Sequence, residues 1–123
     1  MKIAKLSQVP KEIHAAPQGY PTMFTKPVIR QVPPIDSKEY DLSIVTFGKG
    51  VRNKLHAHTH EQILIVTAGK GIVATEKEER VVTVGDIILF AAGEKHWHGA
   101  TEDSEFAHLY FKRIESKLTQ FED

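Results

Sequence analysis

The stretch from Gly50 to Gly69 reads GVRNKLHAHTHEQILIVTAG and decides how the chain folds. Within it, His56, His58 and His60 lie two positions apart, and Gln62 follows at the same spacing. Residues two apart on a strand share a face, so His56 and His58 are predicted to present two imidazoles to one side, close enough to hold one metal ion. The run ILIV that follows is short, apolar and β-branched, which is typical of a strand rather than a helix. Neutral imidazole is the commonest metal ligand in proteins and suits Zn, Cu, Fe and Ni.

The composition indicates one domain without a strong charge. The chain has 123 residues, 16 basic and 16 acidic side chains, and no cysteine. This length is close to the commonest size of a single domain. The balanced charge predicts no nucleic-acid partner and no membrane partner, and the lack of cysteine excludes disulfides, thiolate nucleophiles and Cys-type zinc sites. No apolar run is long enough for a signal peptide or a membrane helix, so we expect a soluble, cytoplasmic protein.

Residues 1–39 are predicted to form a proline-rich N-terminal arm. All six prolines lie there, and proline is confined to turns, strand starts and sheet edges. Short edge strands are predicted at residues 1–6 and 26–32, with loops between them. The arm either wraps the core or pairs with a second subunit, and we favour pairing within a homodimer because small β domains often cover open edges in this way.

From residue 40 onward, short strand-like segments alternate with glycine turns. Strands are predicted at residues 40–47, 51–58, 62–68, 72–76, 80–84, 87–90, 96–100 and 106–113. Gly69-Lys70-Gly71 is predicted to be a turn, and residues 114–123 a terminal helical turn or a frayed end. Many short strands without helical periodicity predict an all-β barrel or sandwich.

A second group of histidines follows in the stretch GDIILFAAGEKHWHGA, from Gly85 to Ala100. Here a buried strand ends in a turn of small residues, and His96 and His98 come next. If His96 faces inward, His98 faces inward too. His108 stands inside a later apolar strand, where a buried histidine is costly unless it is hydrogen-bonded or ligated. These strands are therefore expected to aim metal-capable groups at one interior.

The two histidine stretches together resemble the two motifs of the cupin superfamily. The first motif is matched by Gly50, His56, His58, Gln62 and Gly69, all at fitting spacings. The second is matched by Gly85, Gly93 and His96, while Ala91 and Ala100 replace the usual proline and asparagine. The resemblance implies a jelly-roll β-barrel, usually dimeric, with one divalent metal in the barrel. The barrel would occupy residues 40–123.

The segments QILIVTAG and GEKHWHGA resemble more closely the small single-domain cupins related to carboxymuconolactone decarboxylase-associated proteins, which include the manganese-dependent cupin hydroxynitrile lyases. This resemblance implies one divalent transition metal per chain, with Mn favoured and Fe, Ni, Co, Zn or Cu as other choices. It implies the metal ligands His56, His58, Gln62 and His96, although His60 could stand in for Gln62. It also implies cavity histidines at His98 and His108.

The implied ligands are all neutral, so they leave the full positive charge of the metal uncompensated. A more positive site polarises a bound carbonyl or alkoxide more strongly and disfavours oxidation of the metal. His98 and His108 could then move a proton, although hydrogen-bonded core histidines are an equal alternative. Tyr110, and Lys95 if it bends inward, could bind a substrate oxygen.

Three functions are compatible with these observations. The favoured one is a metal-dependent, lyase-type enzyme that acts on a small carbonyl or hydroxy compound. The alternatives are a metal-dependent dioxygenase and a non-catalytic sensor that binds a small molecule. Cupin barrels serve all three purposes, so the fold does not choose between them.

Overall fold

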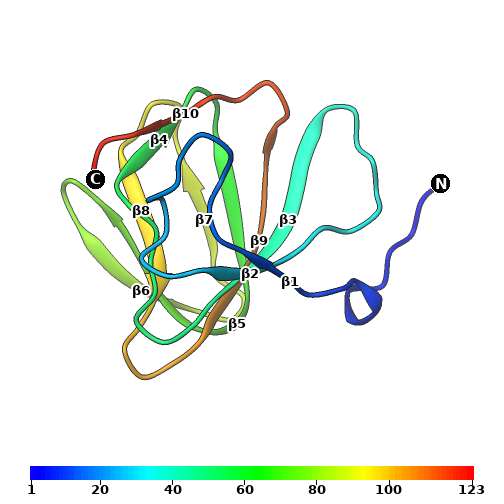
Figure 1. The fold of residues 1–123 in the computed structure, drawn as a ribbon, viewed down its shortest axis with the longest axis horizontal. Coiled ribbons are helices and arrows are strands. Elements are labelled where there is room, and N and C mark those ends of the chain that lie inside the picture. The colour runs from blue at the N-terminus through cyan, green and yellow to red at the C-terminus, as the bar shows by residue number, and fades with distance from the viewer.

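Ten strands form one antiparallel sheet that curls into a barrel (Figure 1). The computed structural model describes all 123 residues. No helix in it has the length and apolar character needed to cross a membrane. The elements are the 3₁₀ turn η1 (Leu6–Gln8) and the strands β1 (Glu12–His14), β2 (Val28–Gln31), β3 (Tyr40–Phe47), β4 (His56–His58), β5 (Gln62–Thr75), β6 (Glu79–Thr83), β7 (Ile87–Phe90), β8 (His96–Ala100), β9 (Phe106–Arg113) and β10 (Leu118–Gln120). The predicted all-β barrel is confirmed.

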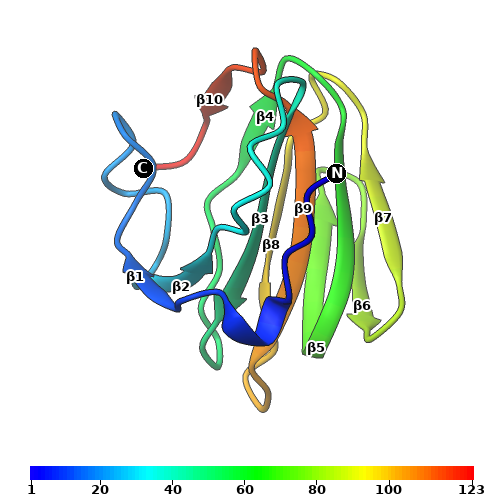
Figure 2. The ribbon, with the colours of Figure 1, turned by 90° about the vertical axis from the view of Figure 1, so that its right-hand side faces the viewer.

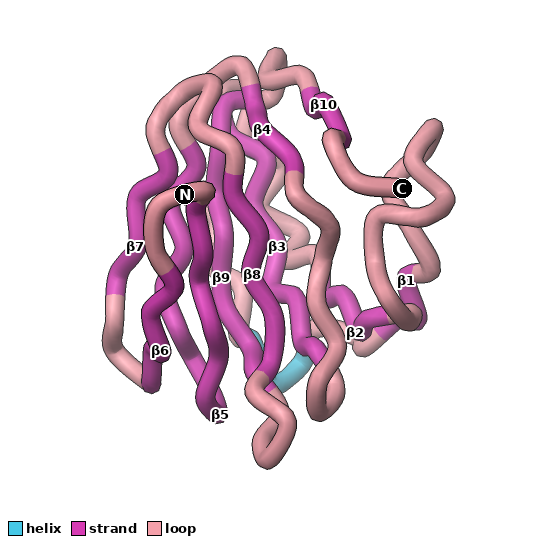
Figure 3. Tube along the Cα trace, turned by 90° about the vertical axis from the view of Figure 1, so that its left-hand side faces the viewer, coloured by secondary structure: helices cyan, strands magenta, loops and turns pink.

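The long strand β5 joins the two walls of the barrel. Its first half pairs with β9 and β7, and this wall continues through β3 to β2 and β1 (Figure 2). Its second half pairs with β6 and β8, and this wall continues through β4 to β10 (Figure 3). The register of β5 against β9 shifts between Val66 and Ala68, which is where the strand passes from one wall to the other.

The predicted turn at Gly69-Lys70-Gly71 is wrong, because β5 runs through these residues without interruption. Instead, Gly69 and Gly71 allow β5 to lie unusually close to the start of β9. A Cβ on Gly69 would lie 1.8 Å from the carbonyl oxygen of Glu105, and one on Gly71 would lie 2.5 Å from the ring of Phe106. Gly69 also has a φ of +71°, a conformation that glycine adopts without a steric penalty.

The two ends of the chain differ most from the predicted elements. Residues 1–6 form no strand, whereas the strand predicted at 26–32 is confirmed as β2. The strand predicted at 51–58 is shortened to β4, preceded by isolated bridges at Arg52 and Asn53. The helical or frayed end predicted for 114–123 is wrong, because β10 pairs with β4 there. The strand at the C-terminal end depends on a partner, β4, that lies far away in the sequence.

Apolar side chains fill the barrel between the two walls. Phe47 and Phe106 are fully buried and stack with their ring centroids 6.0 Å apart. Leu64 and Val66 of β5 belong to the same buried cluster. Val28 of β2 joins it as well, so the N-terminal segment packs directly on the barrel of its own chain.

Replacing Gly69 by alanine is expected to destabilise the fold strongly, because the new methyl group meets the backbone of Glu105. Gly85→Ala is the matched control, since Gly85 has a φ of +92° but nothing within 4 Å of an added Cβ. We expect the control to lower the free energy of unfolding by about 1 to 2 kcal/mol, the cost of a left-handed backbone. Gly69→Ala should lower it by at least about 3 kcal/mol. Urea unfolding measures both values, and equal losses would contradict the role given to Gly69.

Candidate metal centre

Three histidines from two neighbouring strands converge inside the barrel. His56 and His58 lie on β4 and His96 begins β8, where it is the direct cross-strand partner of His56. Each ring offers one nitrogen, and these three atoms lie within 4.8 Å of one another. All three side chains are buried. This arrangement could hold one metal ion.

Backbone carbonyls orient two of these rings. Nδ1 of His56 lies 2.5 Å from the carbonyl oxygen of Lys54, and Nδ1 of His96 lies 2.8 Å from that of Glu94. A carbonyl oxygen only accepts hydrogen bonds, so each Nδ1 must carry the proton and donate it. Each Nε2 is therefore left with its lone pair, which is the form that ligates a metal.

Three buried polar atoms at the centre have no hydrogen-bond partner. They are Nε2 of His58, Nε2 of His96 and Oε1 of Gln62, the first residue of β5. A buried polar atom left unsatisfied costs about 1–3 kcal/mol, and a shared cation would satisfy all three if His58, like His96, carries its proton on Nδ1. The residues therefore fit a divalent metal. His60 lies outside this group, and its Nδ1 is 3.0 Å from the hydroxyl of Thr59.

Burial keeps the three histidines neutral. It lowers the pKa of His56 well below its usual value and that of His58 to about 3. The pKa of His96 is lowered for the same reason, and the charge that His96 would carry lowers the other two further. Metal binding therefore does not have to displace protons from these rings near pH 7.

A second pair of histidines lies beside the first group. His98 of β8 and His108 of β9 are buried, and Nδ1 of His98 lies 3.2 Å from Nε2 of His108. Burial lowers the pKa of His98 well below its usual value and that of His108 to about 4. The structure thus brings all five predicted inward histidines into one interior.

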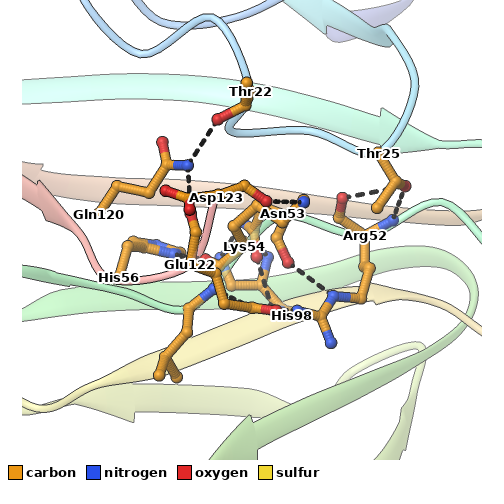
Figure 4. A network of polar contacts seen from close by, with 11 residues as sticks. Thr22, Thr25, Arg52, Asn53, Lys54, His56, His98, Gln120, Glu122 and Asp123 are labelled. Carbon is orange, nitrogen blue, oxygen red and sulfur yellow. Dashed lines mark hydrogen bonds and ion pairs between the residues drawn. The ribbon is translucent and has the colours of Figure 1, made fainter.

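Asn53 holds His98 in place, and the spacing of the sequence motifs gave no sign of this role. Its Oδ1 accepts a hydrogen bond of 2.8 Å from the backbone N–H of His98, so its amide nitrogen must face the imidazole ring, 3.1 Å from Nε2 (Figure 4). That Nε2 then accepts, which leaves the proton on Nδ1 of His98. Nδ1 can therefore donate to His108.

A cavity of about 630 Å³ opens onto these groups. Gln62, His58 and both members of the second pair line it, and so does Tyr110. The Tyr110 hydroxyl donates to a carboxylate oxygen of Asp41 at 3.3 Å. Burial and Asp41 raise the pKa of Tyr110 to about 12, so this hydroxyl keeps its proton.

Lys95 does not line the cavity, so the condition set for a role in binding a substrate oxygen is not met. Its ammonium group lies 4.5 Å from the centroid of the Phe121 ring. A cation over an aromatic face is attracted to it, and here that attraction holds the lysine against the C-terminal segment.

The C-terminal segment closes the barrel wall next to the histidines. The hydroxyl of Tyr20 donates to the carbonyl oxygen of Leu118, and Glu122 accepts from the backbone N–H of Leu55 at 2.6 Å. Glu122 also forms an ion pair with Arg52 (Figure 4). These contacts, together with the β4–β10 pairing, fix the strand that carries His56 and His58.

A sequence profile described as the cupin domain matches residues 43–111, which is more than half of the chain. The chain belongs to the cupin family. The matched range contains both histidine groups, so the cupin core and the candidate centre coincide.

Individual cupins and cupin-like proteins resemble this one to different degrees. The (R)-mandelonitrile lyase of Granulicella tundricola is 43% identical over 81 residues, which are 63% of this chain and 60% of the lyase. A cupin-like protein from Thermotoga maritima superposes with a TM-score of 0.74 at 26% identity and covers 89% of this chain and 86% of its own. The polyketide cyclase RemF from Streptomyces resistomycificus superposes with a TM-score of 0.79 at 16% identity, over 100% of this chain and 88% of the cyclase. At this identity the similarity shows a shared fold alone.

The stability of the metal-free protein is expected to depend on pH through His108. In an unfolded chain a histidine titrates near 6.5, whereas burial lowers the pKa of folded His108 to about 4. Between these values the unfolded state binds more protons, so the free energy of unfolding falls as the pH drops through this window. The contribution of one such histidine is at most about 1.4 kcal/mol per pH unit. Urea unfolding of the native protein and of His108→Gln, with a chelator present, should show a shallower slope for the variant. Equal slopes would contradict the expectation.

Proposed function

We propose that this cupin is a metal-dependent enzyme of the lyase type, with one divalent transition metal held by His56, His58, His96 and Gln62. The observation that carries the proposal is the set of buried lone pairs on His58, His96 and Gln62 that find no partner in the protein. Manganese is our first choice, because the resemblance to manganese-dependent cupin lyases favours it. The other divalent transition metals share the same ligand preferences.

The charge of the ligand set favours Lewis-acid chemistry. Three neutral imidazoles and one amide oxygen add no negative charge to the centre. A metal bound there supplies a strong Lewis acid that polarises a carbonyl or hydroxyl oxygen of the substrate. An acidic fourth ligand would lower that charge by one and would make a redox role easier.

The second histidine pair supplies the proton chemistry in this proposal. His98 and His108 are neutral near pH 7, and neutral imidazole is the form that accepts a proton. The bond of 3.2 Å between them lets a proton pass from one ring to the other. Tyr110 lines the same cavity with a protonated hydroxyl, which would donate to a substrate oxygen after turning away from Asp41. These three residues are the proposed catalytic groups.

The substrate class follows from the size of the cavity and from the similarity to a lyase. A space of about 630 Å³ admits a small molecule. The relative that is 43% identical is named a mandelonitrile lyase, and a nitrile of that type is a small hydroxy compound. We therefore propose a small carbonyl or hydroxy compound as the substrate.

Metal content tests the proposed ligands. His96→Ala removes a central imidazole and is expected to reduce the metal content from about one ion per chain to almost none. His60→Ala is the matched control, because His60 lies in the same stretch of chain but outside the group of converging nitrogens. Elemental analysis of manganese-loaded, dialysed proteins measures the difference. Equal loss in both variants would overturn the ligand set.

Gln62→Glu tests the proposed chemistry. The variant keeps an oxygen ligand but lowers the charge of the site by one, so we expect it to retain the metal and to lose about tenfold or more in kcat/KM for release of a carbonyl product from a panel of cyanohydrins. Product release by the manganese-loaded native protein supports the lyase. Absence of turnover across the panel would overturn it, and oxygen consumption with a phenolic substrate would favour the dioxygenase instead.

A further inference from the structure

One cation that lines the cavity, the half-buried Arg30, has no ion-pair partner. Arg30 of β2 lines the cavity, and its Nε is buried without a hydrogen bond. Arg30 takes part in none of the ion pairs of the chain. Glu12 lies opposite Arg30 across the β1–β2 pair, but it is exposed and forms no ion pair with it. A buried N–H donor without an acceptor is costly, and an anion in the cavity would supply that acceptor.

The strand register aims Arg30 at the proposed catalytic histidines. Arg30 is the cross-strand partner of Val45, and Val45 is the partner of His108. Directly opposite residues on neighbouring strands point to the same face of a sheet. Val28, two positions before Arg30, already belongs to the buried core. Arg30 and His108 therefore share one row on the inner face of the wall.

The other charged groups of the cavity neutralise each other. The ammonium group of Lys112 lies 2.7 Å from Asp41 and forms an ion pair with it. With Arg30 the lining thus holds two cations and one anion, which leaves one net positive charge before any metal is bound. A cavity of this kind attracts a monoanion, and the planar fork of a guanidinium matches a carboxylate with two parallel hydrogen bonds.

We propose that Arg30 binds the carboxylate of a small 2-hydroxy or 2-oxo acid whose reacting oxygen faces the histidine centre. The carboxylate sits at the β2 end of the row and is held by the guanidinium. The hydroxyl or carbonyl carbon then lies toward His108 and the candidate metal ligands. The assignment of this acid as the substrate rests on the proposed function, whereas its binding does not require turnover.

Binding of a matched pair of probes tests the proposal. 2-Hydroxyisobutyrate carries the carboxylate, and 2-hydroxyisobutyramide has the same shape without the charge. Calorimetry with metal-free protein should show at least about tenfold tighter binding of the acid, as expected for a charge-assisted bidentate pair. Arg30→Gln should abolish this preference and leave the affinity for the amide unchanged. Arg80→Gln, at an exposed arginine on β6 outside the cavity, should keep it.

Two results would overturn the proposal. The first is that the native protein binds the acid no tighter than the amide. This result would reject the proposal even if the Arg30→Gln variant does not fold. The other is an acid preference that survives in Arg30→Gln. Competition with methyl phosphate tests whether the site prefers a phosphate to a carboxylate. Stronger binding of methyl phosphate than of the acid would overturn the carboxylate assignment.

The same measurements separate this proposal from the proposed function. An Arg30-dependent preference for the acid without any lyase turnover rejects the lyase chemistry and keeps the carboxylate site. Turnover of neutral cyanohydrins by the manganese-loaded protein, without any preference for the acid, rejects the carboxylate site and keeps the lyase.

Discussion

The burial of five imidazoles and the amides of Asn53 and Gln62 inside an apolar barrel is the constraint on which this structure depends. Protein interiors tolerate such groups only when their polar atoms are satisfied. Apolar side chains set the ring positions, since Phe90 stacks on His96 at a centroid distance of 3.8 Å and Phe47 packs against both His98 and His108. Backbone carbonyls and Asn53 then satisfy some of the nitrogens. Nitrogens of His56, His58 and His96 converge within 4.8 Å of one another, so the same packing that buries the histidines forms a group that could bind a cation.

The strand β5 connects this requirement to the rest of the fold. It begins with Gln62 at the centre, continues through the core residues Leu64 and Val66, and then crosses to the opposite wall. The crossing brings β5 against β9 so closely that only glycine fits at positions 69 and 71. As a result, the register of β9 is fixed on the wall that carries His108 and Lys112. Stability and the geometry of the site are therefore set by the same strand pairing.

The sequence predicted those parts of the molecule that depend on local pattern. Strands such as 40–47 and 106–113 were correct, because β-branched and aromatic residues are frequent in them, although both faces of each are buried along part of its length. The motif spacing also placed both histidine groups inside the barrel. The segments β1 and β10 were missed because neither has an apolar run, and each is formed by backbone pairing with a distant strand. The direction of Lys95 was left open, because the sequence next to His96 does not reveal that the lysine will meet the ring of Phe121.

The electrostatic roles of Asn53 and Arg30 could not be read from spacing for a similar reason. Each becomes significant only through what lies opposite it across the sheet or across the barrel. The hydrogen bonds of Asn53 determine which nitrogen of His98 carries the proton. Lys112 and Asp41 neutralise each other, so the net positive charge of the cavity comes from Arg30. Burial and the neighbouring imidazoles, not Arg30, lower the pKa of His98, and burial lowers that of His108. Arg30 acts on Tyr110 instead, where its charge lowers the pKa against the larger upward effect of burial. An anion bound to Arg30 would cancel that lowering, so the charge of the ligand and the acidity of the Tyr110 hydroxyl are linked through one arginine of the N-terminal segment.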